Sequence, residues 1–391
     1  MKKPIHIRES GPRSELAGGL VMVDLRPLRS NYRALSRVVG PARVAGMVKA
    51  DAYGLGIAEV VPALAAEGCD TFFVATADEG IAARRAAADA RIFVLNGLFS
   101  EEAAAVFTAH RLTPVLSGAT DIALWERHCA RHDVDRSCAI QVDTGLNRLG
   151  LTVQQALAFA ADNALTRAVE PVLVMSHLAC GDERDHPLNR RQAEAFSAVR
   201  AAFPGVPASL ANSSGLLLGR EFHLDLVRPG IAVYGGAPSS GVTMKTVVTA
   251  EARVLQVRRA QAGETVSYGA TQVLERDTLV AIAAAGYADG LPRSVSGSGV
   301  PLRDVLPGGC GSIRGRRVPI LGRVTMDLTM FDVTDLGADA VVAGDFIQLF
   351  GADLPVDEAA RSAGTIAYEL LTGLSRRFTR FHVGMEGPDE T

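Results

Sequence analysis

The feature that most constrains this chain is a regular alternation of short apolar runs and alanine-rich segments between residues 43 and 230. Apolar strands separated by amphipathic helices are typical of a parallel sheet covered on both faces. Eight such units favour a closed (β/α)8 barrel over an open sheet. The predicted strands are Arg43–Val48, Thr71–Ala75, Arg91–Asn96, Thr113–Leu116, Cys138–Val142, Pro171–Ser176, Pro207–Leu210 and Asp225–Val227. The helices predicted between them include Ile57–Glu67, Ala77–Ala87, Glu101–His110, Ala119–Arg131, Val153–Asp162 and Asn189–Ala202.

The pattern changes after about residue 244, where strands joined by Gly, Pro and Asp turns predominate. The predicted strands are Val247–Val257, Thr278–Ala285, Arg317–Leu321, Leu328–Val333 and Phe346–Phe350, with one helix over Ala363–Leu371. We therefore predict an α/β chain with a barrel at 25–244 and a mainly β domain at 245–391. An N-terminal strand within 15–24 is expected to join the second domain, and residues 1–14 are expected to be flexible.

Composition excludes several classes of function. Forty basic against 43 acidic residues give a net charge of −3, without the basic excess of a nucleic-acid-binding protein. The segment Met1–Glu15 lacks the apolar core of a secretory signal, and apolar runs such as Leu279–Gly286 are too short to span a membrane. Five scattered cysteines without Cys-x-x-Cys indicate reduced thiols in a cytoplasm. His128 and His132 are interpreted as a solvated helix end, and no metal site is predicted.

Polar residues follow most of the predicted barrel strands, at the rim where barrel enzymes place their catalytic groups. They are Lys49, Asp143, His177, Asn212 with Ser213, and Arg228. A lysine that ends a buried strand is either turned toward solvent or chemically used, because burying its charge is costly. A desolvated lysine amine is the group that forms Schiff bases with carbonyl cofactors.

The loops after the seventh and eighth strands have the composition of a phosphate site. They read Asn212-Ser213-Ser214-Gly215 and Arg228-Pro229-Gly230-Ile231. Hydroxyls and free backbone N–H groups at the start of a short helix suit a dianion, and Gly230 allows close approach of the backbone. A phosphate at this rim and a lysine after the first strand together predict a site for pyridoxal 5'-phosphate.

The order of the motifs carries a resemblance to a known family. The chain resembles the alanine racemases over roughly residues 20 to 385. The matching segments are Val48–Gly54 (VKADAYG), Asp143–Gly150 (DTGLNRLG), Ser176–Ala179 (SHLA), Asn212–Ser214 (NSS), Arg228–Gly230 (RPG), Ser267–Gly269 (SYG), Gly286–Gly290 (GYADG) and Gly322–Asp327 (GRVTMD). The resemblance implies interconversion of L- and D-alanine, which supplies D-alanine for peptidoglycan, by a homodimer.

The resemblance also implies roles for individual residues. Lys49 holds pyridoxal 5'-phosphate as a Schiff base and moves a proton on one face of the substrate Cα. Tyr268, from the second domain of the partner subunit, serves the other face. His177 and Arg228 are implied as catalytic neighbours that favour the tyrosine phenolate. The implied cofactor-binding residues are Lys49, Tyr53, Arg148, His177, Asn212, Ser213, Arg228, Gly230, Ile231 and Tyr368, and the implied substrate-binding residues are Arg148, Met326 and Tyr287.

Two positions bear on alternative functions. Arg228 offers only hydrogen-bond donors, whereas decarboxylases of the same fold place a carboxylate opposite the pyridine nitrogen. Gln141 stands where many family members have a carbamylated lysine, so the orientation of Arg148 by an amide or a bound anion is open, as is a broader-specificity racemase. A pyridoxal phosphate carrier of this type consists of the barrel alone, and the β domain argues against it.

Overall fold

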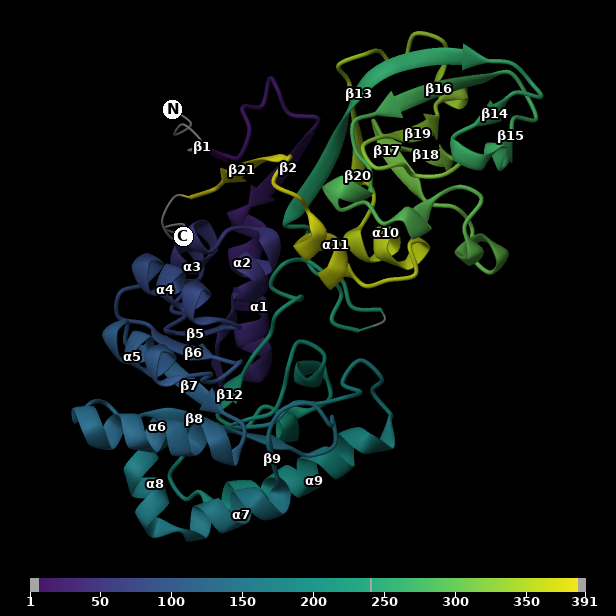
Figure 1. Cartoon of the computed structure of the whole chain (residues 1–391). Helices are drawn as coiled ribbons and strands as arrows, with labels where there is room; N and C mark the ends of the chain where they lie inside the picture. The colour runs from purple at the N-terminus through teal and green to yellow at the C-terminus, as the bar shows by residue number, and fades with distance from the viewer. Residues whose placement is uncertain (1–6, 240, 386–391) are drawn as a thin grey trace.

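Eight parallel strands of the N-terminal half form a ring, as the alternation predicts (Figure 1). The computed structural model describes residues 7–239 and 241–385. The first strand is divided at Ala45 into β3 and β4. The strands are β3 (Arg43–Val44), β4 (Gly46–Met47), β5 (Thr71–Val74), β6 (Arg91–Val94), β7 (Thr113–Leu116), β8 (Cys138–Asp143), β10 (Pro171–Met175), β11 (Ala208–Ser209) and β12 (Leu226–Val227). All eight predicted strands are confirmed, with small shifts at their ends.

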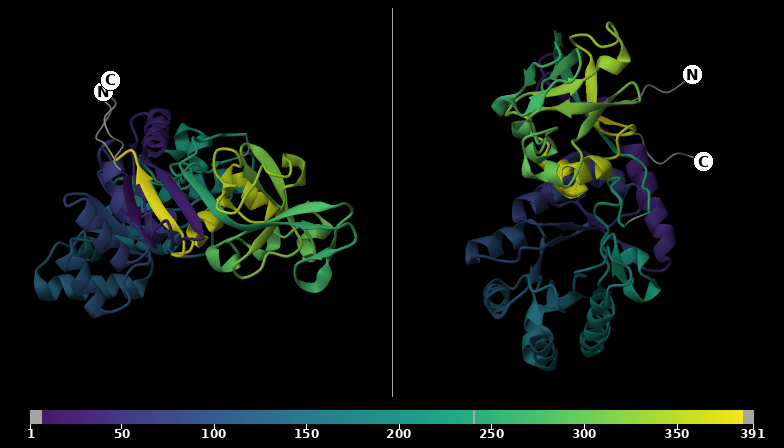
Figure 2. Two further views of the ribbon diagram at one scale, coloured as in Figure 1. Left: turned by 90° about the horizontal axis from the view of Figure 1, so that it is seen from above. Right: turned by 90° about the vertical axis from the view of Figure 1, so that its right-hand side faces the viewer.

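The ring closes through backbone hydrogen bonds at its last strand. β12 pairs in parallel with β3, and the Asp225 N–H donates to the Ala208 carbonyl at 3.1 Å on the β11 side. Helices lie outside the ring, as the right-hand view of Figure 2 shows. They are α1 (Leu25–Val39), α3 (Ile57–Ala65), α4 (Ala77–Ala86), α5 (Glu101–Ala109), α6 (Ala119–His132), α7 (Val153–Ala161), α8 (Asn163–Val169) and α9 (Pro187–Ala202), while the short α2 (Lys49–Gly54) follows β4 directly.

The interior of the barrel is apolar and tightly packed. Phe72, Phe73 and Val74 of β5 are fully buried, and the Phe73 ring stacks on Phe93 of β6 with 4.8 Å between centroids. Such continuous apolar strands form because both faces of a parallel sheet are covered. The barrel core therefore fixes the positions at which the strands end and the functional loops begin.

The second domain is a mainly β structure built around one long strand. In its largest sheet the order is β1-β21-β2-β13-β16-β19-β18-β17-β20, and β13 also pairs with β20. The strands are β1 (Ile7–Ser10), β2 (Gly19–Asp24), β13 (Val248–Ala260), β16 (Thr278–Ala283), β17 (Cys310–Ile313), β18 (Arg316–Leu321), β19 (Thr329–Asp332), β20 (Phe346–Phe350) and β21 (Thr379–Val383). A hairpin of β14 (Thr265–Val266) and β15 (Gln272–Val273) extends from it, and β9 (Leu151–Thr152) pairs with β8 in the barrel.

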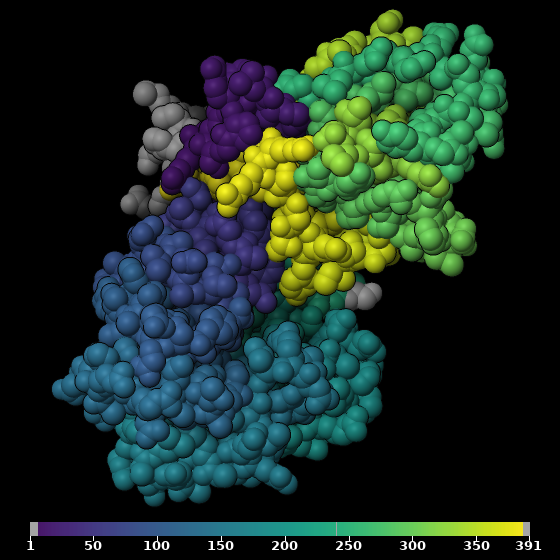
Figure 3. Space-filling model, in the orientation of Figure 1, coloured from purple at the N-terminus to yellow at the C-terminus, as the bar shows by residue number. Residues whose placement is uncertain are grey.

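The first and last described strands pair in this sheet. β2 pairs antiparallel with β13 and parallel with β21, so the N-terminal strand joins the second domain. Within the range expected to be flexible, Ile7–Ser10 forms β1 against β21, and residues 1–6 lie outside the described part of the chain. In Figure 3 the two end segments (purple and yellow) lie where the barrel meets the second domain.

One helix prediction is wrong in its extent. The segment predicted as a helix over Ala363–Leu371 contains a break, since α10 (Val356–Ser362) ends before it and α11 (Ala367–Gly373) begins within it. Gly364 between them has a φ of +68°, in the left-handed region that ends helices. No helix in residues 7–239 and 241–385 is long and apolar enough to cross a membrane.

We predict that Phe73→Ala lowers the free energy of unfolding by about 3–5 kcal/mol, because it removes a buried ring from the barrel interior. Urea unfolding followed by circular dichroism measures the change. Phe99→Ala is the matched control: Phe99 is 78% exposed in the loop after β6, so its truncation should change stability by no more than about 0.5 kcal/mol. Equal losses in the two variants would contradict the packing described.

Candidate active site

A cavity of about 230 Å3 opens at the carboxyl ends of the barrel strands. Its lining includes four of the predicted site residues, Lys49, Arg148, His177 and Arg228, which come from separate parts of the sequence. Gln141 lies in the same lining, together with Asn96, which sequence reasoning did not single out. The parallel strands bring these side chains to one rim because their carboxyl ends all face the same way.

Lys49 begins a turn of unusual backbone conformation. The next four residues, Ala50, Asp51, Ala52 and Tyr53, have φ between 52° and 60°, so α2 is a left-handed turn. This conformation costs roughly 1–2 kcal/mol per residue in L-amino acids and persists only where surrounding contacts fix it. At its start the Ala50 N–H donates to Oε1 of Glu79 at 2.6 Å. Glu79 also accepts the Ala75 N–H at 2.7 Å, so α4 holds the start of the turn.

The electrostatics of the cavity favour a neutral amine and an anionic ligand. Burial, followed by the nearby Arg148 charge, lowers the pKa of Lys49, and Glu79 opposes the shift. Burial, followed by the Arg228, Arg148 and Lys49 charges, lowers the pKa of His177 to about 3, so its ring is neutral at pH 7. No Asp or Glu is among the residues that line this cavity. An anion would therefore be stabilised there, and the lowered pKa increases the share of the Lys49 amine that is neutral.

Arg228 is held rigidly at the end of β12. Its guanidinium is buried, and it donates to the Ser176 carbonyl at 2.5 Å and to the Ser209 hydroxyl. The Ser209 hydroxyl in turn donates to the Leu226 carbonyl at 2.6 Å. Burial lowers the pKa of Arg228 to about 9, which leaves it protonated at neutral pH. Arg228 therefore presents a fixed hydrogen-bond donor to whatever occupies the cavity.

The predicted phosphate-binding residues lie together beside the Lys49 turn. The Tyr53 ring contacts the Tyr368 ring at 5.8 Å between centroids, and a Cβ added to Gly230 would lie 2.1 Å from the Tyr53 hydroxyl oxygen. The Ser213 hydroxyl accepts the Gly230 N–H at 2.8 Å, which ties the two loops to each other. The buried Ile231 follows in the same loop. These contacts need glycine at 230, because any side chain would displace the Tyr53 hydroxyl.

Three further polar residues near the ends of the barrel strands have structural contacts. Tyr234 was missed by sequence reasoning, although it lies in the apolar segment after the Arg-Pro-Gly motif. It stacks on Tyr53 at 4.6 Å and donates its hydroxyl hydrogen to the Met47 carbonyl at 2.8 Å. Asn212 accepts the Gly215 N–H at 2.9 Å and so supports the loop. Asp143 accepts the Gly145 N–H at 2.8 Å and caps its own loop.

The structure places Tyr268, Tyr287 and Met326 on the second domain, outside the lining of the Lys49 cavity in the same chain. All three are exposed, and Tyr268 is 72% exposed. Tyr268 follows β14 in the hairpin that lies at the end of the molecule away from the barrel (Figures 1 and 2). The Tyr287 N–H donates to the Thr325 carbonyl at 3.0 Å, which keeps Tyr287 beside the Met326 loop. One chain by itself thus has its predicted second base far from Lys49.

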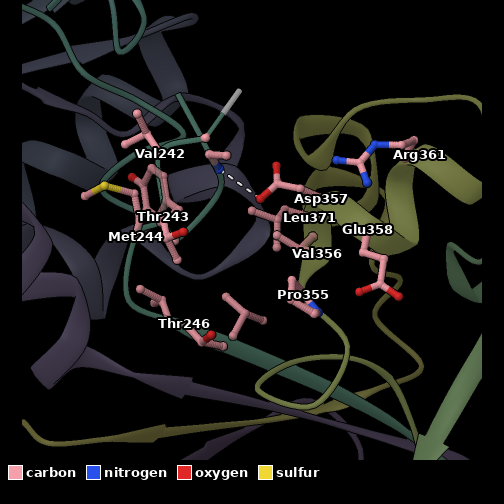
Figure 4. A pocket seen from close by; sticks show the side chains of 16 residues that line it. Val242, Thr243, Met244, Thr246, Pro355, Val356, Asp357, Glu358, Arg361 and Leu371 are labelled. Atoms are coloured by element: carbon pink, nitrogen blue, oxygen red, sulfur yellow. Dashed lines mark hydrogen bonds between the residues drawn. The ribbon is translucent and has the colours of Figure 1, made fainter. Parts of the chain in front are cut away.

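A larger cavity, of about 390 Å3, contains none of the predicted site residues. It lies between the segment that leaves the barrel, including Val242 and Met244, and α10 (Figure 4). Asp357 accepts the Ala237 N–H at 2.9 Å across its edge, as the dashed line shows. Neither a lysine nor a histidine lines this cavity. Although it is larger than the Lys49 cavity, it is therefore not the candidate active site.

The histidine pair on α6 has structural contacts. His128 is buried, and its Nε2 lies 2.9 Å from the Thr108 hydroxyl oxygen, so the interpretation of a solvated helix end is wrong for this residue. Its ring also stacks on Trp125. Within the described residues, no cluster of three or more His, Cys, Asp or Glu could hold a metal ion.

The fold and the site define the class of the protein. The chain is a two-domain protein, a (β/α)8 barrel followed by a mainly β domain, and its candidate site combines a desolvated lysine after the first strand with a buried arginine after the last.

Comparison with known proteins identifies the family within this class. The alanine racemase N-terminal domain profile matches residues 23–238, and the C-terminal domain profile matches residues 247–382. The alanine racemase of Rhizobium meliloti is 50% identical over 373 residues, covering 94% of this chain and 97% of that protein. The biosynthetic alanine racemase of Agrobacterium fabrum is 50% identical over 361 residues, 92% of each chain.

A solved structure agrees with these matches. The alanine racemase of Bartonella henselae, solved with covalently bound pyridoxal phosphate, has a TM-score of 0.85 and 35% identity, covering 94% of this chain and 99% of that one. The chain therefore belongs to the alanine racemase family and is an isomerase.

We predict that trace labelling of the cofactor-free protein by acetic anhydride modifies Lys49 at a lower pH than an ordinary lysine, whose pKa is about 10.4. Only the neutral form of the amine reacts, and its fraction increases as the pH rises through the pKa. A lower pKa therefore means labelling at a lower pH. Arg148→Gln removes a charge that lowers this pKa, so labelling should shift to higher pH. Glu79→Gln removes a charge that raises it, so labelling should shift to lower pH.

Mass spectrometry of digested protein measures this labelling against the exposed Lys245 as the internal reference. Shifts in the same direction for the two variants would contradict the electrostatic assignment.

Proposed function

We propose that this chain interconverts L- and D-alanine, supplying D-alanine for peptidoglycan, with pyridoxal 5'-phosphate held on Lys49. The observation that carries the proposal is the cavity itself, where a lysine amine of lowered pKa faces two arginines and no carboxylate. The identity to named alanine racemases supports alanine as the substrate.

The residues present fit this cofactor. Its phosphate suits the cluster of Tyr53, Ser213, Gly230, Ile231 and Tyr368, where one loop approaches the Tyr53 hydroxyl closely enough to exclude a side chain. The cation-rich cavity suits its remaining negative charge. When bound, pyridoxal phosphate supplies the electron sink that makes the substrate Cα–H acidic.

Arg228 tunes the reaction toward racemisation. Arg228 is fixed by its contacts to Ser176 and Ser209 and offers only donors, so it would give the pyridine nitrogen of a bound cofactor a donor and not a carboxylate. Withdrawal of electrons into the ring would then be limited, which would favour return of the proton to Cα over other reactions. A decarboxylase of this fold would need a carboxylate at this position, and a carrier would not need the second domain.

Racemisation requires a base on each face of the substrate Cα. On one face the Nζ of Lys49 removes or returns the proton. On the other face the hydroxyl oxygen of Tyr268 of the partner subunit does so, since Tyr268 is exposed on its own chain and lies outside that chain's cavity. The neutral ring of His177 gives this hydroxyl a hydrogen-bond partner, and the charge of Arg228 behind it favours the phenolate.

The substrate carboxylate is bound by groups from both subunits. Arg148 lines the cavity of one chain, and the Met326 backbone N–H of the other contributes beside Tyr287, which controls the entrance. Gln141 brings no charge to Arg148, and its amide nitrogen donates to the Val142 carbonyl at 3.4 Å. The unpaired cysteines support a cytoplasmic location.

Mixing of two inactive variants tests the shared site. Lys49→Ala and Tyr268→Phe each remove one base and should each lower kcat by at least about a hundredfold. After unfolding and refolding as an equimolar mixture, half of the dimers contain both variants, and each of these has one intact site. Racemisation of L-alanine, followed by optical rotation, should recover to about a quarter of the wild-type rate.

Refolding of each variant alone is the control and should give no recovery. If the mixture were as inactive as the separate variants, the two bases would come from one chain, and the proposed sharing of the site would be wrong.

A second prediction concerns the phosphate cluster. Gly230→Ala should weaken pyridoxal phosphate binding about tenfold or more, because the new methyl group overlaps the Tyr53 hydroxyl. Fluorescence titration of the cofactor-free protein measures the dissociation constant. Gly118→Ala is the control, since its Cβ would meet nothing nearer than 3.8 Å. Unchanged binding in Gly230→Ala would place the phosphate elsewhere.

A further inference from the structure

The C-terminal strand β21 holds the end of the Lys49 turn with two side chains. Nε of Arg380 donates to the Gly54 carbonyl at 3.1 Å, and Nε2 of His382 lies 2.7 Å from the Leu55 carbonyl oxygen. Residues two apart in a strand point to the same face, so both can reach neighbouring carbonyls. The last residues of the second domain therefore contact the turn that begins at Lys49.

Arg380 also connects this turn to the helix that carries Tyr368. Its guanidinium donates to the Leu374 carbonyl at 2.8 Å and to the Ser375 carbonyl at 3.1 Å, just after α11. α11 packs directly against the end of the turn, because a Cβ at Gly54 would lie only 2.7 Å from the Leu371 carbonyl oxygen of that helix. The end of the turn is enclosed by backbone on one side and by Arg380 on the other.

His382 belongs to a buried polar cluster that spans the two domains. It is 1% exposed, and its Nε2 lies 3.9 Å from Oε2 of the buried Glu59 on α3. Arg8 of β1 pairs with the other Glu59 oxygen at 3.0 Å. The Leu55 carbonyl oxygen can only accept, so Nε2 of His382 carries the proton that it donates there, and Nδ1 has no partner among the described residues. Buried polar groups are costly, and apolar residues would pack here without that cost.

We propose that Arg380 and His382, with Glu59 behind His382, are positioning residues for Lys49. Left-handed backbone over Ala50–Tyr53 is unfavourable by itself, and it is retained because Glu79 holds its start and β21 holds its end. The second domain thus orients the lysine amine of its own chain without contributing a residue to the lining of the cavity. The inference rests on the proposed function in that Lys49 is the cofactor-bearing residue.

Hydrogen–deuterium exchange of the full-length, cofactor-loaded protein tests this role. His382→Leu removes the donor to the Leu55 carbonyl, and exchange in peptides covering residues 49–57 should accelerate about tenfold. His382→Gln places an amide N–H near the position of Nε2 and should restore slow exchange. The dissociation constant of pyridoxal phosphate should rise about tenfold in His382→Leu and return toward the wild-type value in His382→Gln.

A matched control separates positioning from general loss of stability. His223 is also buried, its Nε2 lies 2.8 Å from the Leu216 carbonyl oxygen, and its Nδ1 is unpartnered among the described residues. His223→Leu should leave exchange over residues 49–57 at the wild-type rate. If His382→Leu prevents folding, Arg380→Met replaces it, because this variant removes the donor to the Gly54 carbonyl. Exchange over residues 49–57 is then measured in the same way.

Wild-type exchange over residues 49–57 in His382→Leu or Arg380→Met would overturn the proposal, as would equal acceleration in His223→Leu. Failure of the proposed function is distinguishable, because wild-type protein would then bind no pyridoxal phosphate, while the exchange rates of the turn would still be compared among the cofactor-free wild type and variants.

Discussion

The site depends on one constraint on Lys49. A lysine at the end of a buried strand must either lose its charge or have a partner for it. Burial and the Arg148 charge disfavour the ammonium form of Lys49, while Glu79, which holds the start of the turn, only partly compensates. The surrounding cavity contains further positive charge from Arg228 and a neutral His177. A site of this kind is unfavourable when empty of anions and is suited to an anionic aldehyde that reacts with the amine.

The two domains divide the work of the site between them. The barrel supplies the amine, the arginines and the phosphate loops from the carboxyl ends of its strands. In the function we propose, the second domain supplies Tyr268 and Met326, which are exposed and lie outside the lining of their own chain's cavity, and it also carries the strand that holds the Lys49 turn. Assembly of two chains is therefore part of the chemistry we propose, because a single chain presents only one of the two bases to its cavity.

Sequence patterns predicted the parts that arise from periodicity and strand order. The barrel strands follow from the alternation of apolar runs and helices, and the meeting of Lys49, His177 and Arg228 follows from their common place at strand ends. The left-handed turn after Lys49 could not be predicted, because its four residues have no intrinsic preference for it and distant contacts impose it. The contacts of Glu79 and His382 were missed for the same reason, since they join segments far apart in the sequence.

The most direct measurement uses the small number of lysines in the chain, which are Lys2, Lys3, Lys49 and Lys245. The purified protein, loaded with pyridoxal phosphate, would be reduced with borohydride, digested and analysed by mass spectrometry. A single stoichiometric adduct on the peptide containing Lys49, with loss of racemase activity in proportion to it, is the expected result. An adduct on another lysine, or full activity after complete labelling of Lys49, would contradict the assignment of this amine as the reactive group of the site.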